Sequence, residues 1–168
     1  NDKNDLNLYI VKKNNENIEV KGSLSNNKKT IDPKVLFELA KIKSDLLSDK
    51  KITIETDNKF AFQIDEKQNV KDFSINSNLK FDELYFNKKY QDLIYLEDGV
   101  IETEYSNNNL SVQILSKYSF IEDESKNVVN DKNDLNLYIV KKNNENIEVK
   151  GSLSNNKKTI DPKVLFEL

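Results

Sequence analysis

Apolar and polar residues alternate along most of the chain, as they do in β-strands that bury one face and expose the other to water. Polar segments such as KKNNEN, TDNK, DEKQN and SNNN interrupt the alternation and are typical of turns. The pattern therefore predicts an antiparallel sheet of short hairpins with one apolar and one polar face. The apolar stripe comprises Leu6, Leu8, Ile10, Ile18, Val20, Ile52, Ile54, Phe60, Phe62, Ile64, Phe73, Ile75, Leu79, Phe81, Leu110, Val112, Ile114, Tyr118 and Phe120.

One segment follows a helical spacing instead. Asp32 is a suitable cap, Pro33 suits the first helical position, and the apolar residues after it recur at helical intervals, so we predict a helix over residues 33–48. The segment DELYFNKKYQDLIYLED follows neither spacing and is expected to be a loop with a helical turn. The predicted fold class is mainly β, with about eight strands and one helix per repeat in a curved, open-ended antiparallel meander or groove.

The chain contains an exact internal repeat. The segment NDKNDLNLYIVKKNNENIEVKGSLSNNKKTIDPKVLFEL occupies residues 1–39 and again residues 130–168. We therefore divide the chain into one full repeat unit, residues 1–129, and the start of an identical second unit, residues 130–168. This organisation is typical of arrays in which each unit packs on its neighbour. An engineered duplication would leave the same identity, and the sequence alone leaves both origins open.

The composition argues against several classes of function. The 26 basic residues are all lysines, the net charge is -3, and arginine, the usual bidentate reader of phosphates and bases, is absent. We therefore expect no nucleic acid partner. Cysteine and histidine are also absent, which excludes thiol nucleophiles, histidine acid–base catalysis and the commonest zinc ligands within this segment.

The acidic residues do not form a recognisable site either. Glu102 and Glu104 share one face of a predicted strand, close to Glu97 and Asp98, but no calcium-loop motif is present, and alternating glutamates are usually the solvated face of a strand. No nucleophile elbow or glycine-rich phosphate loop occurs among only three glycines. We predict that the protein is not an enzyme and has no catalytic residues, no cofactor and no metal site.

Two interpretations of the apolar stripe remain open. It could be an ordinary core, packed under the helix or a second sheet. However, one helix per 129 residues is too short to cover so many strands. An uncovered apolar strip of this size is normally a binding surface, so the second interpretation is a hydrophobic groove.

The order of elements resembles a known family. A helix (IDPKVLFELAKIKSDL) and a hairpin (KITIETDNKFAFQID) precede the run SINSNLKFDEL and the strand pair GVIETEYSNNNL. This order is similar to the AsmA-like family of repeating β-groove proteins, in particular its YhdP and TamB type. The resemblance implies a periplasmic, non-enzymatic bridge of the cell envelope, anchored in the inner membrane through segments outside this chain, along which phospholipids slide between membranes.

The resemblance also implies partners and site residues. The expected partners are phospholipids, further repeats of the same chain, and inner- and outer-membrane proteins. The residues expected to contact acyl chains in lipid transport are Phe60, Phe62, Ile64, Phe73, Ile75, Val112, Ile114 and Phe120.

Two rival hypotheses use the same pattern. In the first, the chain is a tandem-repeat stalk or adhesin on a bacterial cell surface, with the stripe sealed in a β-sandwich core. In the second, it is a filament subunit whose repeated hairpin completes the sheet of a neighbour by strand addition. The three hypotheses differ in whether the stripe is open along the array, sealed within each unit, or buried between chains.

Overall fold

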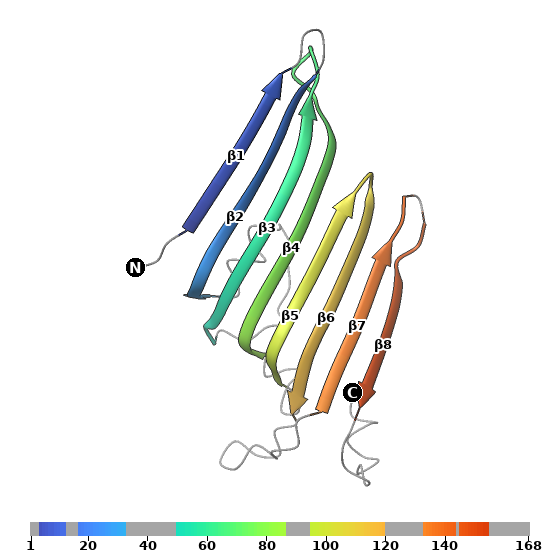
Figure 1. Ribbon diagram of the computed structural model, residues 1–168. Coiled ribbons are helices and arrows are strands. Elements are labelled where there is room, and N and C mark those ends of the chain that lie inside the picture. Colours follow the sequence, from blue (N-terminus) through green and yellow to red (C-terminus); the bar gives the residue numbers. More distant parts are fainter. Residues whose placement is uncertain are drawn as a thin grey trace.

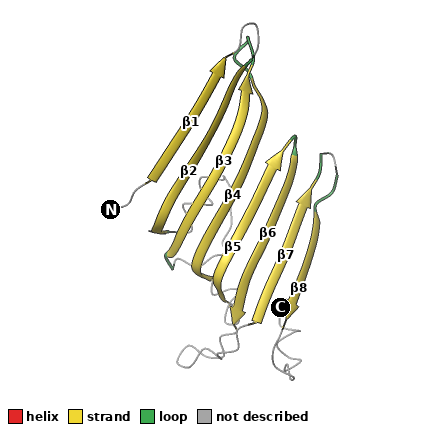
Figure 2. Cartoon of the chain, viewed as in Figure 1, coloured by secondary structure: helices red, strands yellow, loops and turns green. Residues whose placement is uncertain are grey.

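The described part of the chain forms a single antiparallel sheet (Figure 1). The computed structural model describes residues 4–12, 17–32, 50–86, 95–119, 133–143 and 145–154. The eight strands are β1 (Asn4–Lys12), β2 (Ile18–Ile31), β3 (Ile52–Ile64), β4 (Val70–Tyr85), β5 (Tyr95–Ser106), β6 (Asn109–Ser119), β7 (Asn133–Lys141) and β8 (Glu148–Ser154). Each strand pairs with the next in sequence, so the sheet is an open meander with β1 and β8 at its edges (Figure 2). The predicted mainly-β antiparallel meander is thus confirmed.

The predicted helix cannot be compared with the structure, because residues 33–48 lie outside the described residues. Within the described ranges, every regular element is a strand. These ranges contain no helix with the length and apolar character needed to cross a membrane.

The structure corrects the predicted number of strands. The sequence pattern divides each of the two segments that form β3 and β4 into a pair of short strands, whereas both are continuous. The predicted turn TDNK lies inside β3, because its polar groups find partners on neighbouring strands. The Asn58 amide donates to the Leu24 carbonyl oxygen at 3.1 Å, and the Ser77 hydroxyl donates to Asn58 at 2.6 Å. Among the described residues, the first repeat unit therefore has six strands rather than about eight.

A second correction concerns the segment DELYFNKKYQDLIYLED, which is predicted to be a loop but contributes to both β4 and β5. Leu96 faces Tyr118 on β6, and Ile101 faces Ile114. Since Tyr118 and Ile114 share one side of β6, β5 must contain one extra residue between Leu96 and Ile101. This residue belongs to a β-bulge at Asp98, whose φ of 48° interrupts the alternation that the sequence pattern relies on.

The most buried apolar residues gather near the end of the sheet where β3 begins and β6 ends. The buried cluster consists of Ile52, Ile54, Phe81, Leu96 and Tyr118. Leu79, Leu84 and Ile101 pack against it and are partly buried. Burial also raises the pKa of the Tyr118 hydroxyl.

The second copy of the repeat continues the sheet. β7 and β8 have the sequences of β1 and β2, and the two hairpins pair in the same register: Leu6 faces Leu24, and Leu135 faces Leu153. β7 also pairs along its other side with β6. Hairpin β7–β8 therefore follows the six strands of the first unit without a break in the hydrogen-bonded ladder.

The turn between β3 and β4 is organised by one carboxylate. The Asp65 side chain is 12% exposed, accepts the backbone N–H groups of Lys67 and Asn69 at 2.9 Å each, and lies 3.0 Å from the Lys71 ammonium. The hydrogen bond from the Asn69 backbone, followed by the contact with Lys71, lowers the pKa of Asp65 from 3.8 to about 2. The ionised carboxylate thus closes the turn.

We predict that this turn makes stability depend on pH. A carboxyl group with a lowered pKa stabilises the fold at pH values above 3.8, and this stabilisation is lost as the pH falls toward about 2. Asp65→Asn should therefore lower the free energy of unfolding at pH 7, and the difference from the unmodified chain should shrink between pH 3.8 and about 2. Urea unfolding across this range measures the effect, with the neighbouring Glu66→Gln as control. A difference that stays constant with pH would contradict the assignment.

Candidate functional site

The predicted lipid-contact residues that the structure describes lie on one face of the sheet. These residues are Phe60, Phe62, Ile64, Phe73, Ile75, Val112 and Ile114, whereas Phe120 lies outside the described residues. Phe60 faces Ile75 across β3 and β4, and alternate residues of a strand share a face. On β6, Ile114 faces Ile101, which in turn faces Leu79 on β4. Leu79 lies on the same side of β4 as Ile75, because the two residues are four positions apart. We call this side of the sheet the apolar face.

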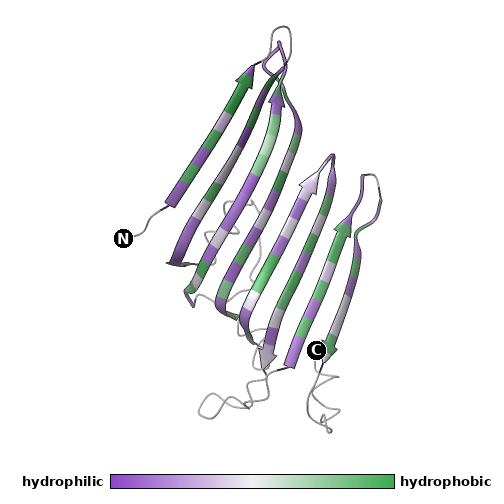
Figure 3. Cartoon of the chain, viewed as in Figure 1, coloured by the Kyte–Doolittle hydropathy of each residue, from purple (hydrophilic) through white to green (hydrophobic). Residues whose placement is uncertain are grey.

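One cross-strand row contains two of the predicted residues, Phe60 and Ile75, whereas Val112 and Ile114 lie in other rows. Its members face one another directly on six consecutive strands, and they are Leu8, Gly22, Phe60, Ile75, Tyr105 and Leu110. Figure 3 shows the alternation of hydrophobic and hydrophilic positions along the strands that produces such rows. The row gives the apolar face a strip that crosses the strands and follows the long direction of the sheet.

Aromatic rings cluster along this strip. We call the row, together with the neighbouring Phe62 and Phe73, the aromatic strip. The Phe60 and Phe62 rings lie 6.4 Å apart and nearly parallel, and the Phe73 and Tyr105 rings lie 6.0 Å apart in a tilted arrangement. Tyr105 is not among the predicted contact residues. The sequence does carry the signal, because Ile101, Thr103 and Tyr105 alternate, and Ile101 belongs to the apolar face.

A band of polar side chains divides the apolar face on the middle strands. The hydroxyl of Thr56 donates to Asn26, the Asn58 amide donates to Thr56 at 3.2 Å, and Ser77 donates to Asn58. The row continues through Thr103 on β5. Because these polar groups satisfy one another, they can lie on an apolar face without a large desolvation cost. The band separates the aromatic strip from the buried cluster.

The aromatic strip is considerably more open than the buried cluster. Phe73 is 42% exposed and Leu8 is 56% exposed, whereas each member of the buried cluster is at most 7% exposed. The remaining predicted contact residues that the structure describes are half-buried by their neighbours in the sheet, and they are Phe60, Phe62, Ile64, Ile75, Val112 and Ile114. In the described structure, the strip therefore offers apolar surface that a ligand could cover.

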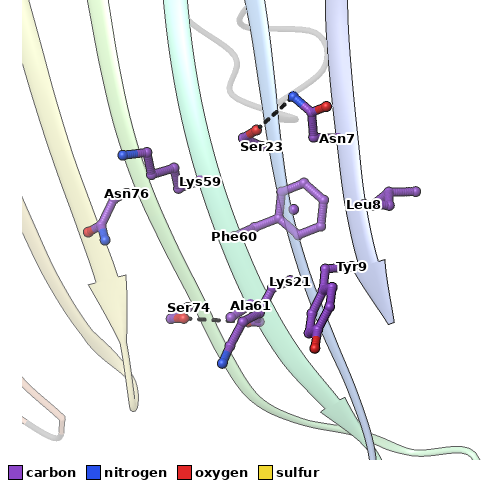
Figure 4. A pocket seen from close by; sticks show the side chains of 11 residues that line it. Asn7, Leu8, Tyr9, Lys21, Ser23, Lys59, Phe60, Ala61, Ser74 and Asn76 are labelled. Carbon is purple, nitrogen blue, oxygen red and sulfur yellow. Dashed lines mark hydrogen bonds between the residues drawn. The ribbon is translucent and has the colours of Figure 1, made fainter. Parts of the chain in front are cut away.

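Phe60 reaches its position because its cross-strand partner is a glycine. Figure 4 shows the Phe60 ring lying across β2, where Gly22 is located. A Cβ atom at Gly22 would collide with Phe60 and would come within 2.9 Å of both the Asn7 carbonyl oxygen and the Leu8 side chain. The same position in the second copy, Gly151, has no aromatic neighbour within this range: the nearest atoms are a Leu137 methyl carbon at 3.2 Å and a backbone oxygen at 3.3 Å.

The two equivalent glycines allow a matched test of this packing. Gly22→Ala should lower the free energy of unfolding by about 1–3 kcal/mol, because the Phe60 ring must move. Gly151→Ala adds the same methyl group to the same local sequence and should change stability by less than about 1 kcal/mol. Urea unfolding of both variants measures the contrast. Equal effects would mean that Phe60 moves aside without cost.

The opposite face is polar and contains a hollow. Two neighbouring rows of this face, Asn7–Ser23–Lys59–Asn76 and Tyr9–Lys21–Ala61–Ser74, line a pocket of about 440 Å³ together with Leu8, Gly22 and Phe60 (Figure 4). The hollow exists because the small Ala61 and Ser74 side chains are flanked by longer ones. Exposed ion pairs such as Lys80–Glu55, at 3.5 Å, lie on the same face and contribute about 0–1 kcal/mol each. These features are those of a solvated surface.

The acidic residues considered in the sequence lie on or near this polar face. Glu102 faces Asn78 and Glu104 faces Asn76, and neither position brings three carboxylates together. Among the residues that the structure describes, no group of Asp, Glu, His or Cys side chains could hold a metal ion.

The comparisons with known proteins give no match: no family model, no curated protein and no solved structure is similar to this chain. The resemblance to the AsmA-like family therefore stays a prediction from the sequence. The geometry of the two faces is the basis for a functional proposal.

Proposed function

We propose that the chain is a non-enzymatic segment of a lipid-transfer bridge, in which the apolar face holds the acyl chains of phospholipids. The observation that supports the proposal best is the half-open aromatic strip, which crosses six strands in a single row. An acyl chain laid along such a row would lose contact with water on the side that touches the strip. A fully buried methylene group contributes about 0.8 kcal/mol, which is the upper limit for each methylene group on the strip.

The continuity of the face supports movement as well as binding. In the row next to the aromatic strip, Val112 of β6 faces Ile139 of β7, which faces Val149 of β8. Apolar surface therefore extends from one unit into the next along this row, whereas in the row of the strip Leu110 faces Lys141. Neighbouring positions along the strip offer similar apolar contacts, so an acyl chain could slide without crossing a high barrier.

The wider assignment rests on the family resemblance. It places the chain in the periplasm, with anchors outside this segment and with inner- and outer-membrane proteins as partners. The helix expected over residues 33–48 and the curvature of the sheet belong to the same proposal. In this arrangement the polar face would be the outer, solvated side of the groove.

A specific observation also favours the rival stalk hypothesis. The cluster of Ile52, Ile54, Phe81, Leu96 and Tyr118 is buried, as a sealed core would be. If the whole apolar face were sealed in this way, the repeats would serve length and reach at the cell surface.

The two hypotheses differ in the expected effect of a charge on the aromatic strip. Phe62→Asp places a carboxylate on the apolar face and should reduce bound phospholipid at least about tenfold, a loss equivalent to about 1.4 kcal/mol. The matched control is the neighbouring Ala61→Asp, which places the same carboxylate on the polar face opposite Lys21. Mass spectrometry of organic extracts from protein purified without detergent measures the bound lipid.

Circular dichroism of both variants completes the experiment. The lipid-transfer proposal expects Phe62→Asp to keep the β-sheet spectrum while losing lipid, and Ala61→Asp to keep both. Unfolding of Phe62→Asp, together with no lipid in the unmodified chain, would support the sealed core of a stalk.

A further inference from the structure

The sequence of one edge strand occurs again in the interior of the sheet. β1 and β7 both have the sequence NDLNLYIVK. Within the described residues, β1 pairs with β2 alone, whereas β7 pairs with β6 on one side and with β8 on the other. The structure therefore shows the same nine residues with and without a strand on their outer side.

The exposed fractions of these residues show how much surface β6 covers on β7. Tyr9 on β1 is 63% exposed, and its equivalent Tyr138 on β7 is 41% exposed. Leu6, Leu8 and Ile10 are all exposed, whereas the three equivalent residues of β7 are half-buried. Among the described residues, the outer side of β1 thus has no strand like the one that covers β7.

The contacts between β6 and β7 define that cover. On the apolar face, Ile114 faces Leu137. On the polar face, the Ser111 hydroxyl donates to the Tyr138 hydroxyl at 3.2 Å, and the Gln113 amide donates to Asn136 at 3.3 Å. Every β7 residue in these contacts has an identical counterpart on β1.

We propose that β6 of one chain binds β1 of a second copy of this chain, in place of its own β7. The register follows from the observed β6–β7 pairing: Ile10 would face Val112, Leu8 would face Ile114, and Tyr9 would face Gln113. The second copy's own sheet then continues from its β2 onward. The two sheets become one sheet, and their apolar faces lie on the same side of it. The displaced hairpin β7–β8 is the competitor for the same edge.

The chain's own β7 and the β1 of a second copy compete for the edge of β6. The outcome depends on the covalent link of β7 to its own chain, because the contacts are the same in both pairings. The two pairings exchange identical side chains, so their local free energies are equal to a first approximation. The chain's own β7 has the advantage of a high effective concentration, while a second copy pays the entropy of association. The 168-residue chain is therefore expected to be mainly monomeric. Any change that weakens β7 but spares β1 favours exchange.

Exchange would be open-ended. A β6 edge on one copy and a β1 edge on the next are different surfaces, so the contact is head-to-tail and each added copy presents a new edge of the same kind. Chains of several copies are therefore expected rather than a closed dimer.

The repeat supplies a pair of matched variants to test the proposal. Leu137→Pro interrupts β7 and should release the β6 edge, since proline within a sheet removes a ladder hydrogen bond. Half-maximal association, measured by analytical ultracentrifugation, should then occur at a concentration at least about tenfold lower than for the unmodified chain, equivalent to about 1.4 kcal/mol. The equivalent Leu8→Pro interrupts β1 and should leave the chain monomeric. Leu137→Pro that stays monomeric and folded at every concentration would overturn the proposal.

A disulfide trap tests the register without weakening the fold. The chain has no cysteine, so Gln113→Cys with Tyr9→Cys introduces only these two thiols, and the proposed register brings the unlike pair together. Within one chain these positions are five strand spacings apart, about 24 Å, which excludes an internal bond. Oxidation should therefore give covalent oligomers. Their yield should rise further when Leu137→Pro is added.

The control shifts the register by four residues on the same face. Gln113→Cys with Asp5→Cys should give at least about tenfold less covalent oligomer, because Asp5 would face Lys117 rather than Gln113 and lie beyond disulfide reach. Equal yields for the two pairs would show that copies meet by random collision and would overturn the proposal. This result would be decisive even if Leu137→Pro failed to fold.

Discussion

The backbone ladder that joins the eight strands is the constraint on which the rest of the structure depends. It fixes which residues face one another, and the alternation within each strand then assigns every side chain to one of two faces. A shift by one residue would move every later side chain of a strand to the other face. The bulge at Asp98 makes one such shift on β5, and with it Leu96 and Ile101 remain on the same face. The apolar face is therefore a consequence of register as much as of composition.

The β class, the hairpin order and the face of the candidate site can be predicted from the sequence, because strict alternation survives over most strands. Alternation alone assigns Phe60 and Phe62 to one face of β3, and the observed register places Ile75 of β4 on the same face. Prediction fails where the physical cause is not local. Asn58 resembles a turn residue, but it lies inside β3 because Leu24 and Ser77, distant in sequence, supply its hydrogen-bond partners. Likewise, no periodicity rule can locate an extra residue at a bulge.

The same face contains two environments with different physical roles. Near Ile52 and Phe81 the apolar side chains are buried and stabilise the sheet. Beyond the band around Asn58 they form the half-open aromatic strip. There the Phe60 ring packs over Gly22, and Leu8 and Phe73 are exposed. A sheet that separates its stabilising contacts from its open contacts in this way can expose apolar surface without losing its fold. This separation is the property that a ligand-binding face requires.

The exact repeat shows that burial here is determined by position in the sheet. Val20 on β2 is 7% exposed, because Phe62 of β3 faces it, whereas the identical Val149 on the edge strand β8 is 59% exposed. The same contrast separates β1 from β7. Each edge strand thus has a sequence that pairs with a further strand elsewhere in the chain: the sequence of β1 pairs with β6, and the sequence of β8 pairs with β3. An unpaired edge of this kind is a template for another strand. A repeat with this property extends its sheet into the unit that follows in the same chain, and in our proposal a second copy competes for the same edge.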